Sequence, residues 1–194
     1  EIGPSYQPGH AHADTFNFEL YVKRNPIIVD SGTSTYNIGE KRSLERSTKA
    51  HNTVTVNDAN SSQIWSGFRV AKRANITKLK ENKNQLSAIH NGYYDQGVLH
   101  QRTWKTQANE ITITDELIGK KVEGKAYFHL HPSVSIEKNE DGFIINNHIQ
   151  IIFNGLVKVT ELETLYSSEF NIYKRNVTLE VIFKKECTAT IKIQ

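Results

Sequence analysis

The sequence predicts an all-β fold: an antiparallel β-sandwich of a dozen or more strands with almost no helix. Apolar and polar residues alternate in many short segments, as strands with one buried face require. The pairs Asn154-Gly155 and Asp141-Gly142 are typical of hairpin turns between such strands. No segment has the length and 3.6-residue period of a core helix. Many short strands with close turns indicate a sandwich or a barrel.

The first part of the chain combines three strands with long loops. Glycine and proline make residues 1–9 an irregular entry segment, and Asn25-Pro26 marks a turn. Polar and basic residues at 34–50 predict a long loop with at most one helical turn, and loops of that length are usually functional or disordered. The alternating or apolar segments predict strands at 15–22, 27–29 and 53–56.

From about residue 74 onward the pattern is strand after strand. Short polar turns at 81–84 and 108–109 separate some of these segments. No internal repeat or low-complexity tract interrupts them, so this part is expected to be scaffold. The predicted strands are 74–80, 85–91, 98–107, 110–118, 122–131, 133–138, 143–146, 148–153, 156–161, 169–174, 176–184 and 187–193.

Composition narrows the class of protein. The chain has 194 residues, 37% apolar and 23% charged, which suits a soluble globular protein. No apolar run approaches the ~20 residues of a membrane span, and the net charge of +3 comes without a Lys/Arg block typical of nucleic-acid binding. A lone Cys187 allows no internal disulfide and is expected to be a small buried side chain. Because the chain starts at Glu1 and has no Met, we expect a processed product or a fragment.

The segment PGHAHAD at 8–14 has a high concentration of side chains that can bind a ligand or transfer a proton. His10, His12 and Asp14 alternate directly before a predicted strand, so they are expected to share one face. Two imidazoles and a carboxylate on one face are costly to bury unless they bind a metal, a substrate or each other. The alternative is a solvated strand start.

Three residues at predicted strand ends form a candidate metal set. His12 opens one strand, Asp30 closes another at a Ser-Gly turn, and His51 opens a third. Two His and one carboxylate are a common Zn(II) donor set. Unrelated contacts are the plain alternative. A second alternative makes Asp14 the carboxylate ligand, as in the facial triad of a non-haem Fe(II) oxygenase.

Three blocks of sequence resemble the C-terminal region of the heparinase II/III-like family of polysaccharide lyases. The blocks are PGHAHADTFNFEL at 8–20, PIIVDSGTSTYN at 26–37 and RSTKAHNTVTVNDANSSQIWSGFRVAKRA at 46–74. A weaker block, YFHLHPSV, follows at 127–134. The resemblance is close over residues 3–74 and loose elsewhere.

The resemblance implies an architecture and an activity. Members join an N-terminal helical toroid to a C-terminal antiparallel β-sandwich and cleave acidic polysaccharides, such as heparin, heparan sulfate or alginate, by β-elimination. Residues 1–194 would then be one sandwich domain, whose partners are the substrate and the helical domain of the same parent chain. The resemblance also implies a periplasmic or secreted protein.

The resemblance assigns roles residue by residue. It implies that His12, Asp30 and His51 bind Zn(II) and that His10 faces the substrate cleft. Tyr36, in the family's GTxxY segment, is expected to border the same cleft.

Two residues near the third ligand are candidates for substrate binding. Arg46 and Asn52 flank His51 and are expected to meet an anionic sugar or to support a ligand. Hydrogen bonds that fix the loop are the equal alternative for both.

The family's tyrosine acid/base and its carboxylate-neutralising Asn or His belong to the toroid, which this chain lacks. Elimination needs both proton transfers and charge stabilisation at one sugar. The isolated chain is therefore expected to be inactive. A non-catalytic carbohydrate-binding or interaction sandwich remains the main alternative function.

Overall fold

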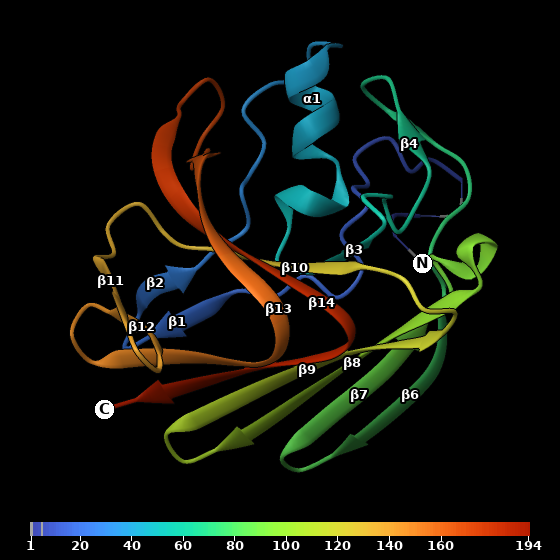
Figure 1. Ribbon diagram of the computed structural model, residues 1–194. Coiled ribbons are helices and arrows are strands. Elements are labelled where there is room, and N and C mark those ends of the chain that lie inside the picture. The colour runs from blue at the N-terminus through green and yellow to red at the C-terminus, as the bar shows by residue number, and fades with distance from the viewer. Residues whose placement is uncertain (1, 5) are drawn as a thin grey trace.

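Antiparallel strands dominate the structure, as predicted. In the computed structural model, which describes residues 2–4 and 6–194, 53% of residues are in strands and 6% in helices (Figure 1). The strands are β1 (Leu20–Val22), β2 (Asn25–Ile28), β3 (Val54–Val56), β4 (Ile64–Trp65), β5 (Arg69–Val70), β6 (Ile76–Asn82), β7 (Gln85–His90), β8 (Val98–Gln107), β9 (Glu110–Gly119), β10 (Gly124–His129), β11 (Ile136–Asn139), β12 (Gly142–Ile145), β13 (Ile149–Tyr166) and β14 (Lys174–Ile193). The helices are α1 (Glu40–Glu45) and two 3-10 turns, Thr48–Ala50 and Tyr94–Gln96.

The long strand β14 connects the two layers of the sandwich. Its first part pairs with β10, from His129↔Thr178 to Gly124↔Phe183, and its second part pairs with β9. The main sheet runs β11-β12-β13-β14-β9-β8-β7-β6, with β3 attached through β10. Because β14 belongs to both parts and the sheet bends along it, the β10 side lies over the β6–β9 side (Figure 1).

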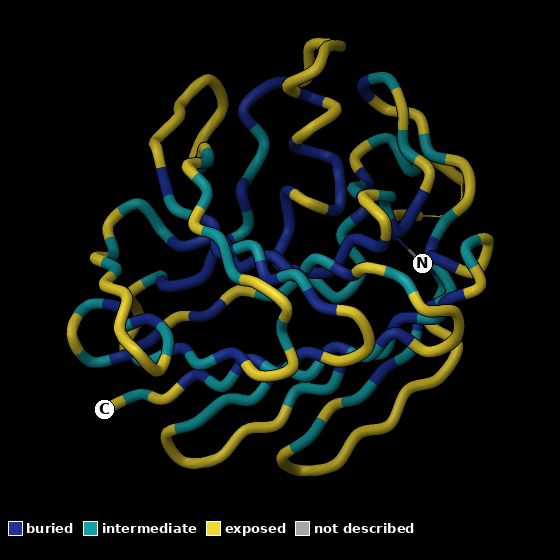
Figure 2. Tube along the Cα trace, viewed as in Figure 1, coloured by how far each residue is buried: buried dark blue, intermediate teal, exposed yellow. Residues whose placement is uncertain are grey.

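The core lies between these layers. Strand residues that face inward are fully buried, among them Val54, Phe128, Leu179 and Val181. Figure 2 shows the same pattern along the trace, with buried segments through the middle and exposed hairpin tips at the edge. Alternation therefore predicted the faces correctly, since one face of each strand is removed from water.

The predicted strand 15–22 is wrong in its first half. Thr15 and Phe16 form a turn closed by the bond from Asn17 N to Asp14 O (2.8 Å), and only Leu20–Val22 is strand. Phe16 has φ +71°, which a bulky residue rarely adopts. Its ring packs on those of His90 and Trp104, and this packing holds the turn in place.

The prediction of a hairpin turn at Asn154-Gly155 was also wrong. The two predicted strands on either side are one strand, β13, which pairs with β14 along its length and has a register shift between Asn154 and Leu156. Gly155 has φ +77°, and a Cβ there would lie 2.4 Å from Glu186 O, so the glycine forms a bulge instead of a turn. The predicted strands 176–184 and 187–193 likewise merge into β14.

Other turns were predicted correctly, and one strand was not. The tips at 82–85, 107–110 and 139–142 are tight hairpins, as expected. Residues 167–173 form a loop instead of the predicted strand 169–174, because Ser167 N donates to Ser31 O (2.8 Å) and Asn171 N to Ser34 O (2.9 Å). These bonds tie the loop to the segment that follows Asp30.

Candidate functional site

A His–Asp pair lies at the centre of the site. His51 is 1% exposed, and its Nδ1 lies 2.6 Å from Asp30 Oδ2. Asn17 Nδ2 donates to the same oxygen (2.7 Å), and Gly32 N donates to Asp30 Oδ1 (2.9 Å). Burial raises the pKa of Asp30, but the hydrogen bond and charge of His51 outweigh it and lower the pKa to about 2. The structure therefore places Asp30 and His51, which are 21 positions apart in the sequence, in direct contact.

His12 joins this pair from the entry segment. Its ring centroid lies 5.2 Å from that of His51, and its Nε2 accepts a hydrogen bond from the Arg42 guanidinium (3.2 Å). Burial, together with the charges of His51 and Arg42, lowers the pKa of His12 to about 3. The ring is thus neutral at pH 7, as a metal ligand must be.

The three predicted zinc ligands are of the residue types that bind zinc, but their side chains are engaged in hydrogen bonds. Among residues 2–4 and 6–194, no group of three or more His, Cys, Asp or Glu is spaced to hold a metal ion. Two ligands of one tetrahedral zinc lie about 3.3 Å apart, given bonds of roughly 2.0 Å, whereas His51 and Asp30 are at 2.6 Å. His51 Nε2, however, is buried without a hydrogen-bond partner. Zinc binding by these residues stays a prediction.

Asp14 does not share a strand face with the histidines, because residues 10–14 are irregular. Burial raises the pKa of Asp14, and the nearby Asp30 raises it further, while His51 lowers it. Asp14 therefore lies near the His–Asp pair, although the extended geometry expected for the segment was wrong.

The second predicted residue group, His10 and Tyr36, lies in an exposed aromatic cluster. The His10 ring meets the edge of Tyr36 at 5.6 Å and of Phe68 at 6.1 Å between centroids. Tyr36 stacks between Phe68 (6.0 Å) and Phe170 (5.8 Å). Tyr36 (43%), Phe68 (44%) and Phe170 (54%) are all exposed, so the cluster is open to solvent, and Arg42 links it to His12.

Arg42, which the sequence did not single out, connects the two groups. It is fully buried at α1 and bonds His12 as above, while its guanidinium carbon lies 5.1 Å from the Tyr36 ring centroid. Its NH2 atom has no partner in the described residues. A basic residue in a polar loop is indistinguishable by sequence from a solvated one, so no pattern could have identified it.

Arg46 and Asn52 are buried and bonded to the backbone. Arg46 donates to the carbonyls of Ala11, Trp65, Ser66 and Arg69 at 3.0–3.3 Å. Neither Arg46 nor Asn52 is exposed. These contacts favour the loop-fixing alternative, and substrate binding by the two residues stays an untested prediction.

Asn52 ties two parts of the rim to β10. Its Nδ2 donates to Phe18 O and Val29 O, both at 2.9 Å, and its Oδ1 accepts from His129 N (2.7 Å). The position of His51 is therefore fixed by its neighbour in sequence.

A buried charge network, which the sequence analysis did not single out, supports the site from the sheet. Asp115 accepts from Arg102 Nε (2.7 Å) and NH2 (2.8 Å) and contacts His100 Nε2 (2.7 Å), and His100 contacts His90 (2.9 Å). Arg102 NH1 donates to the carbonyls of Asn52 (2.6 Å) and Phe16 (2.8 Å). The only available signal was that these side chains fall on the inward face of β7–β9.

Comparison with known proteins points to one family. The family model described as "Heparinase II/III-like, C-terminal" matches residues 1–194. A heparin-sulfate lyase from Bacteroides stercoris is 30% identical over 129 residues, which are 63% of this chain and 17% of the relative. No helix of residues 2–4 and 6–194 has the length and apolar character to cross a membrane.

Solved structures share the fold. A mutant of the heparan sulfate lyase HepC from Pedobacter heparinus superposes with a TM-score of 0.74 and 18% identity, over 99% of this chain and 32% of that chain. The heparinase III BT4657 gene product gives a TM-score of 0.71 and 17% identity, over 100% and 31%.

The chain thus spans no more than about a third of the proteins it matches. The family model nevertheless covers every residue of this chain. On this evidence the chain belongs to the heparinase II/III-like family, as the domain that forms the C-terminal part of its members.

Proposed function

We propose that the chain is the C-terminal sandwich of a lyase that cleaves uronic-acid-containing polysaccharides by β-elimination, and that it forms one wall of the cleft. The observation that carries the proposal is the exposed His10, in edge contact with Tyr36 and Phe68 beside the partly buried His12–His51–Asp30 group. Aromatic faces pack on sugar rings, and an imidazole can both accept and donate a proton. The relatives named as heparin and heparan sulfate lyases support the substrate class.

The elimination has three requirements: a base for the proton at C5, a stabiliser for the carboxylate charge, and an acid for the O4 leaving group. His10 and the Tyr36 hydroxyl have no hydrogen-bond partner among the described side chains, and both are exposed enough to meet a substrate. Arg42 contributes a fixed positive charge behind Tyr36. His10 is therefore proposed as a proton-transfer group and Tyr36 as its neighbour in the cleft.

The remaining groups are proposed to come from a helical domain of a longer parent chain. Holding all catalytic groups close to one sugar contributes much of the rate enhancement, so a domain that forms only one wall of the cleft is orders of magnitude slower than the parent chain. We accordingly propose that the 194-residue chain by itself has no turnover. A periplasmic or secreted location belongs to the same proposal.

We further propose that His12, Asp30 and His51 bind one Zn(II). The ion would supply a positive charge that ties three loops into one rim. The buried, unpartnered His51 Nε2 and the neutral His12 ring support this set, and the His51–Asp30 hydrogen bond must open to admit the ion.

The zinc proposal is tested by metal content and stability together. His51→Ala should lose zinc and melt at a lower temperature with zinc present, whereas His131→Ala, a partly exposed histidine bonded to Ser133, should do neither. Full zinc content in His51→Ala would show that the ligand set is wrong.

The lyase proposal is tested with a parent chain that contains this domain. Product formation is followed by the absorbance of the unsaturated uronate at about 232 nm, which reports proton removal followed by elimination. His10→Ala should cut turnover by at least about 100-fold while the metal stays bound, whereas Tyr21→Ala, an exposed tyrosine of β1, should leave turnover unchanged. Unchanged turnover in His10→Ala would contradict the role of His10.

A non-catalytic carbohydrate-binding sandwich is the second candidate. The stack of Phe68, Tyr36 and Phe170 favours it, because such a surface binds sugars without any chemistry. An assay of the parent chain distinguishes the two candidate functions. If the domain only binds carbohydrate, the parent chain shows no product absorbance, and His10→Ala weakens polysaccharide binding.

A further inference from the structure

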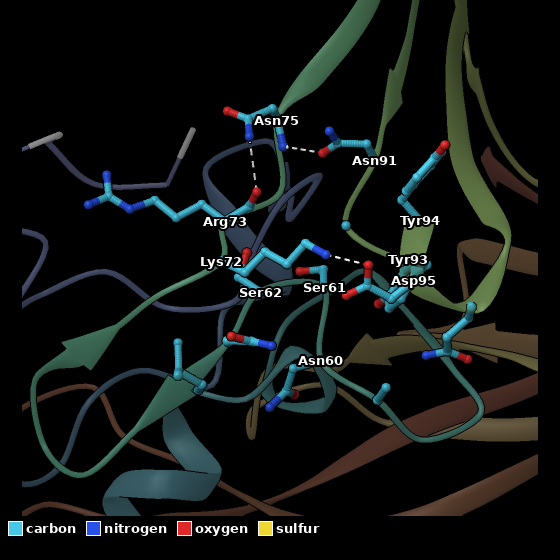
Figure 3. A pocket seen from close by; sticks show the side chains of 15 residues that line it. Asn60, Ser61, Ser62, Lys72, Arg73, Asn75, Asn91, Tyr93, Tyr94 and Asp95 are labelled. Atoms are coloured by element: carbon cyan, nitrogen blue, oxygen red, sulfur yellow. Dashed lines mark hydrogen bonds and ion pairs between the residues drawn. The ribbon is translucent and has the colours of Figure 1, made fainter.

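A second hollow in the surface lies apart from the His site. It encloses about 560 Å³, within the roughly 300–1,000 Å³ typical of small-molecule sites. It is lined by residues of the 59–64 and 72–75 segments and of the 91–96 turn, and by none of His10, His12, Asp30, Tyr36 or His51. Figure 3 shows that these three segments surround one space.

The lining is rich in amide side chains of fixed orientation. Asn60 Oδ1 accepts from Thr48 N (2.8 Å), and Asn91 Oδ1 accepts from Asn75 N (2.9 Å). These bonds define which end of each amide is oxygen, so each Nδ2 keeps its two N–H donors without a protein partner among the described residues. Figure 3 shows Asn60 and Asn91 on different sides of the space.

Two cations and one anion line the hollow, Lys72, Arg73 and Asp95. Lys72 Nζ pairs with Asp95 Oδ1, which leaves the second carboxylate oxygen as an acceptor. Arg73 also lines the hollow, but its guanidinium donates to the carbonyls of Ile2 and Pro4. Because Lys72 is paired and the Arg73 side chain extends away from the space (Figure 3), the lining presents little positive charge to a sulfate or carboxylate, and a neutral ligand fits it better.

One aromatic side chain completes the set. Tyr94 lines the hollow and is 70% exposed, although its neighbour Tyr93 is buried and bonded to Val54 O. An exposed tyrosine offers an apolar ring with a polar tip to a ligand that has both kinds of surface.

We propose that this hollow binds one uncharged pyranose unit of a saccharide chain. Each sugar hydroxyl both donates and accepts, which matches the free amide donors of Asn60 and Asn91 and the free oxygen of Asp95. The apolar face of the pyranose packs on Tyr94. The site needs no residue of the His10 rim, so it can be present whether or not the chain belongs to a lyase.

The test is a titration of the ¹⁵N-labelled 194-residue chain with two neutral probes, chitotetraose and cellotetraose. Side-chain amide signals report the hollow directly, and the proposal expects those of Asn60 and Asn91 to shift for at least one probe, with a millimolar Kd. Tyr94→Ala should weaken binding about fivefold. Gln63→Ala, an exposed lining residue, should weaken it in the same direction.

Tyr21→Ala is the matched control, because Tyr21 is 54% exposed and lies in β1, outside the hollow. It should leave the Kd unchanged. The proposal is overturned if neither probe shifts the two amides at up to about 20 mM, a concentration well above a millimolar Kd. It is also overturned if shifts appear only around His10 and Tyr36, or if Tyr94→Ala and Gln63→Ala both bind like the unmodified chain.

Discussion

Replacing Asp115 by Ala removes a carboxylate that compensates the charge of a buried arginine, Arg102. Asp115 and Arg102 are both buried and bonded through two parallel contacts of 2.7 and 2.8 Å. Burial opposes ionisation of Asp115, but the charge of Arg102 and the bonds from His100 and Arg102 hold the pKa of the carboxyl well below its usual range. Without Asp115, Arg102 keeps its charge in an apolar interior.

The expected loss is about 3–5 kcal/mol, the usual cost of removing one partner of a buried ion pair. For a chain of this length, each kcal/mol shifts Tm by roughly 2–4 °C, so Asp115→Ala should melt about 12 °C lower. Loss of order should extend to the rim, because Arg102 also donates to the carbonyls of Phe16 and Asn52. The signals of His51 should therefore move as well.

Urea unfolding followed by circular dichroism measures the free energy, and thermal melting measures Tm. Asp141→Ala is the control, because Asp141 is exposed at the β11–β12 tip and should change stability by less than about 0.5 kcal/mol. A loss below about 1 kcal/mol in Asp115→Ala would refute the argument, since such a value is typical of an exposed pair.

Three further predictions follow from the buried groups. Burial lowers the pKa of His90 and His100, so both stay neutral in the folded chain while the unfolded chain takes up protons. The free energy of unfolding should therefore be full above about pH 6.5 and fall below it, by up to about 1.4 kcal/mol per pH unit for each group. A urea midpoint that stays constant from pH 7 to about 5 would contradict this. Gly32→Ala should lower the free energy of unfolding by at least about 2 kcal/mol, because φ is +80° and a Cβ would lie 2.0 Å from Ser167 O. At Gly39 a Cβ would meet nothing within 4 Å, so Gly39→Ala should be nearly neutral. Equal urea midpoints for the two variants would contradict this prediction. Burial raises the pKa of Cys187 to about 12, so its thiol should react with a thiol reagent only after unfolding, and rapid reaction of the native chain would contradict its burial.

The sequence was most informative where one physical rule acts alone. Period-two alternation predicted β8 and β9 nearly to the residue, because each strand has one buried face. It failed where a distant partner decides the conformation. Asn154-Gly155 has the sequence of a turn, but β14 continues past it and converts the glycine into a bulge.

The candidate site divides in the same way. His12, Asp30 and His51 were singled out because a resemblance links three distant segments; the structure brings the three side chains together, and their role as ligands stays a prediction. Arg42 and Arg102 were missed because burial of an arginine depends on partners far away in the chain. Their polar loop or strand context looks the same when the side chain is solvated.

The most direct test of the central claim is where a uronic-acid oligosaccharide binds. In a titration of the ¹⁵N- and ¹³C-labelled 194-residue chain with a heparan sulfate tetrasaccharide, the aromatic signals of His10, Tyr36 and Phe68 should shift together. His10→Ala should reduce those shifts, and Tyr94→Ala should leave them unchanged. Shifts that avoid this aromatic cluster, or no binding at up to about 10 mM, would contradict the claim that this rim is a wall of the substrate cleft.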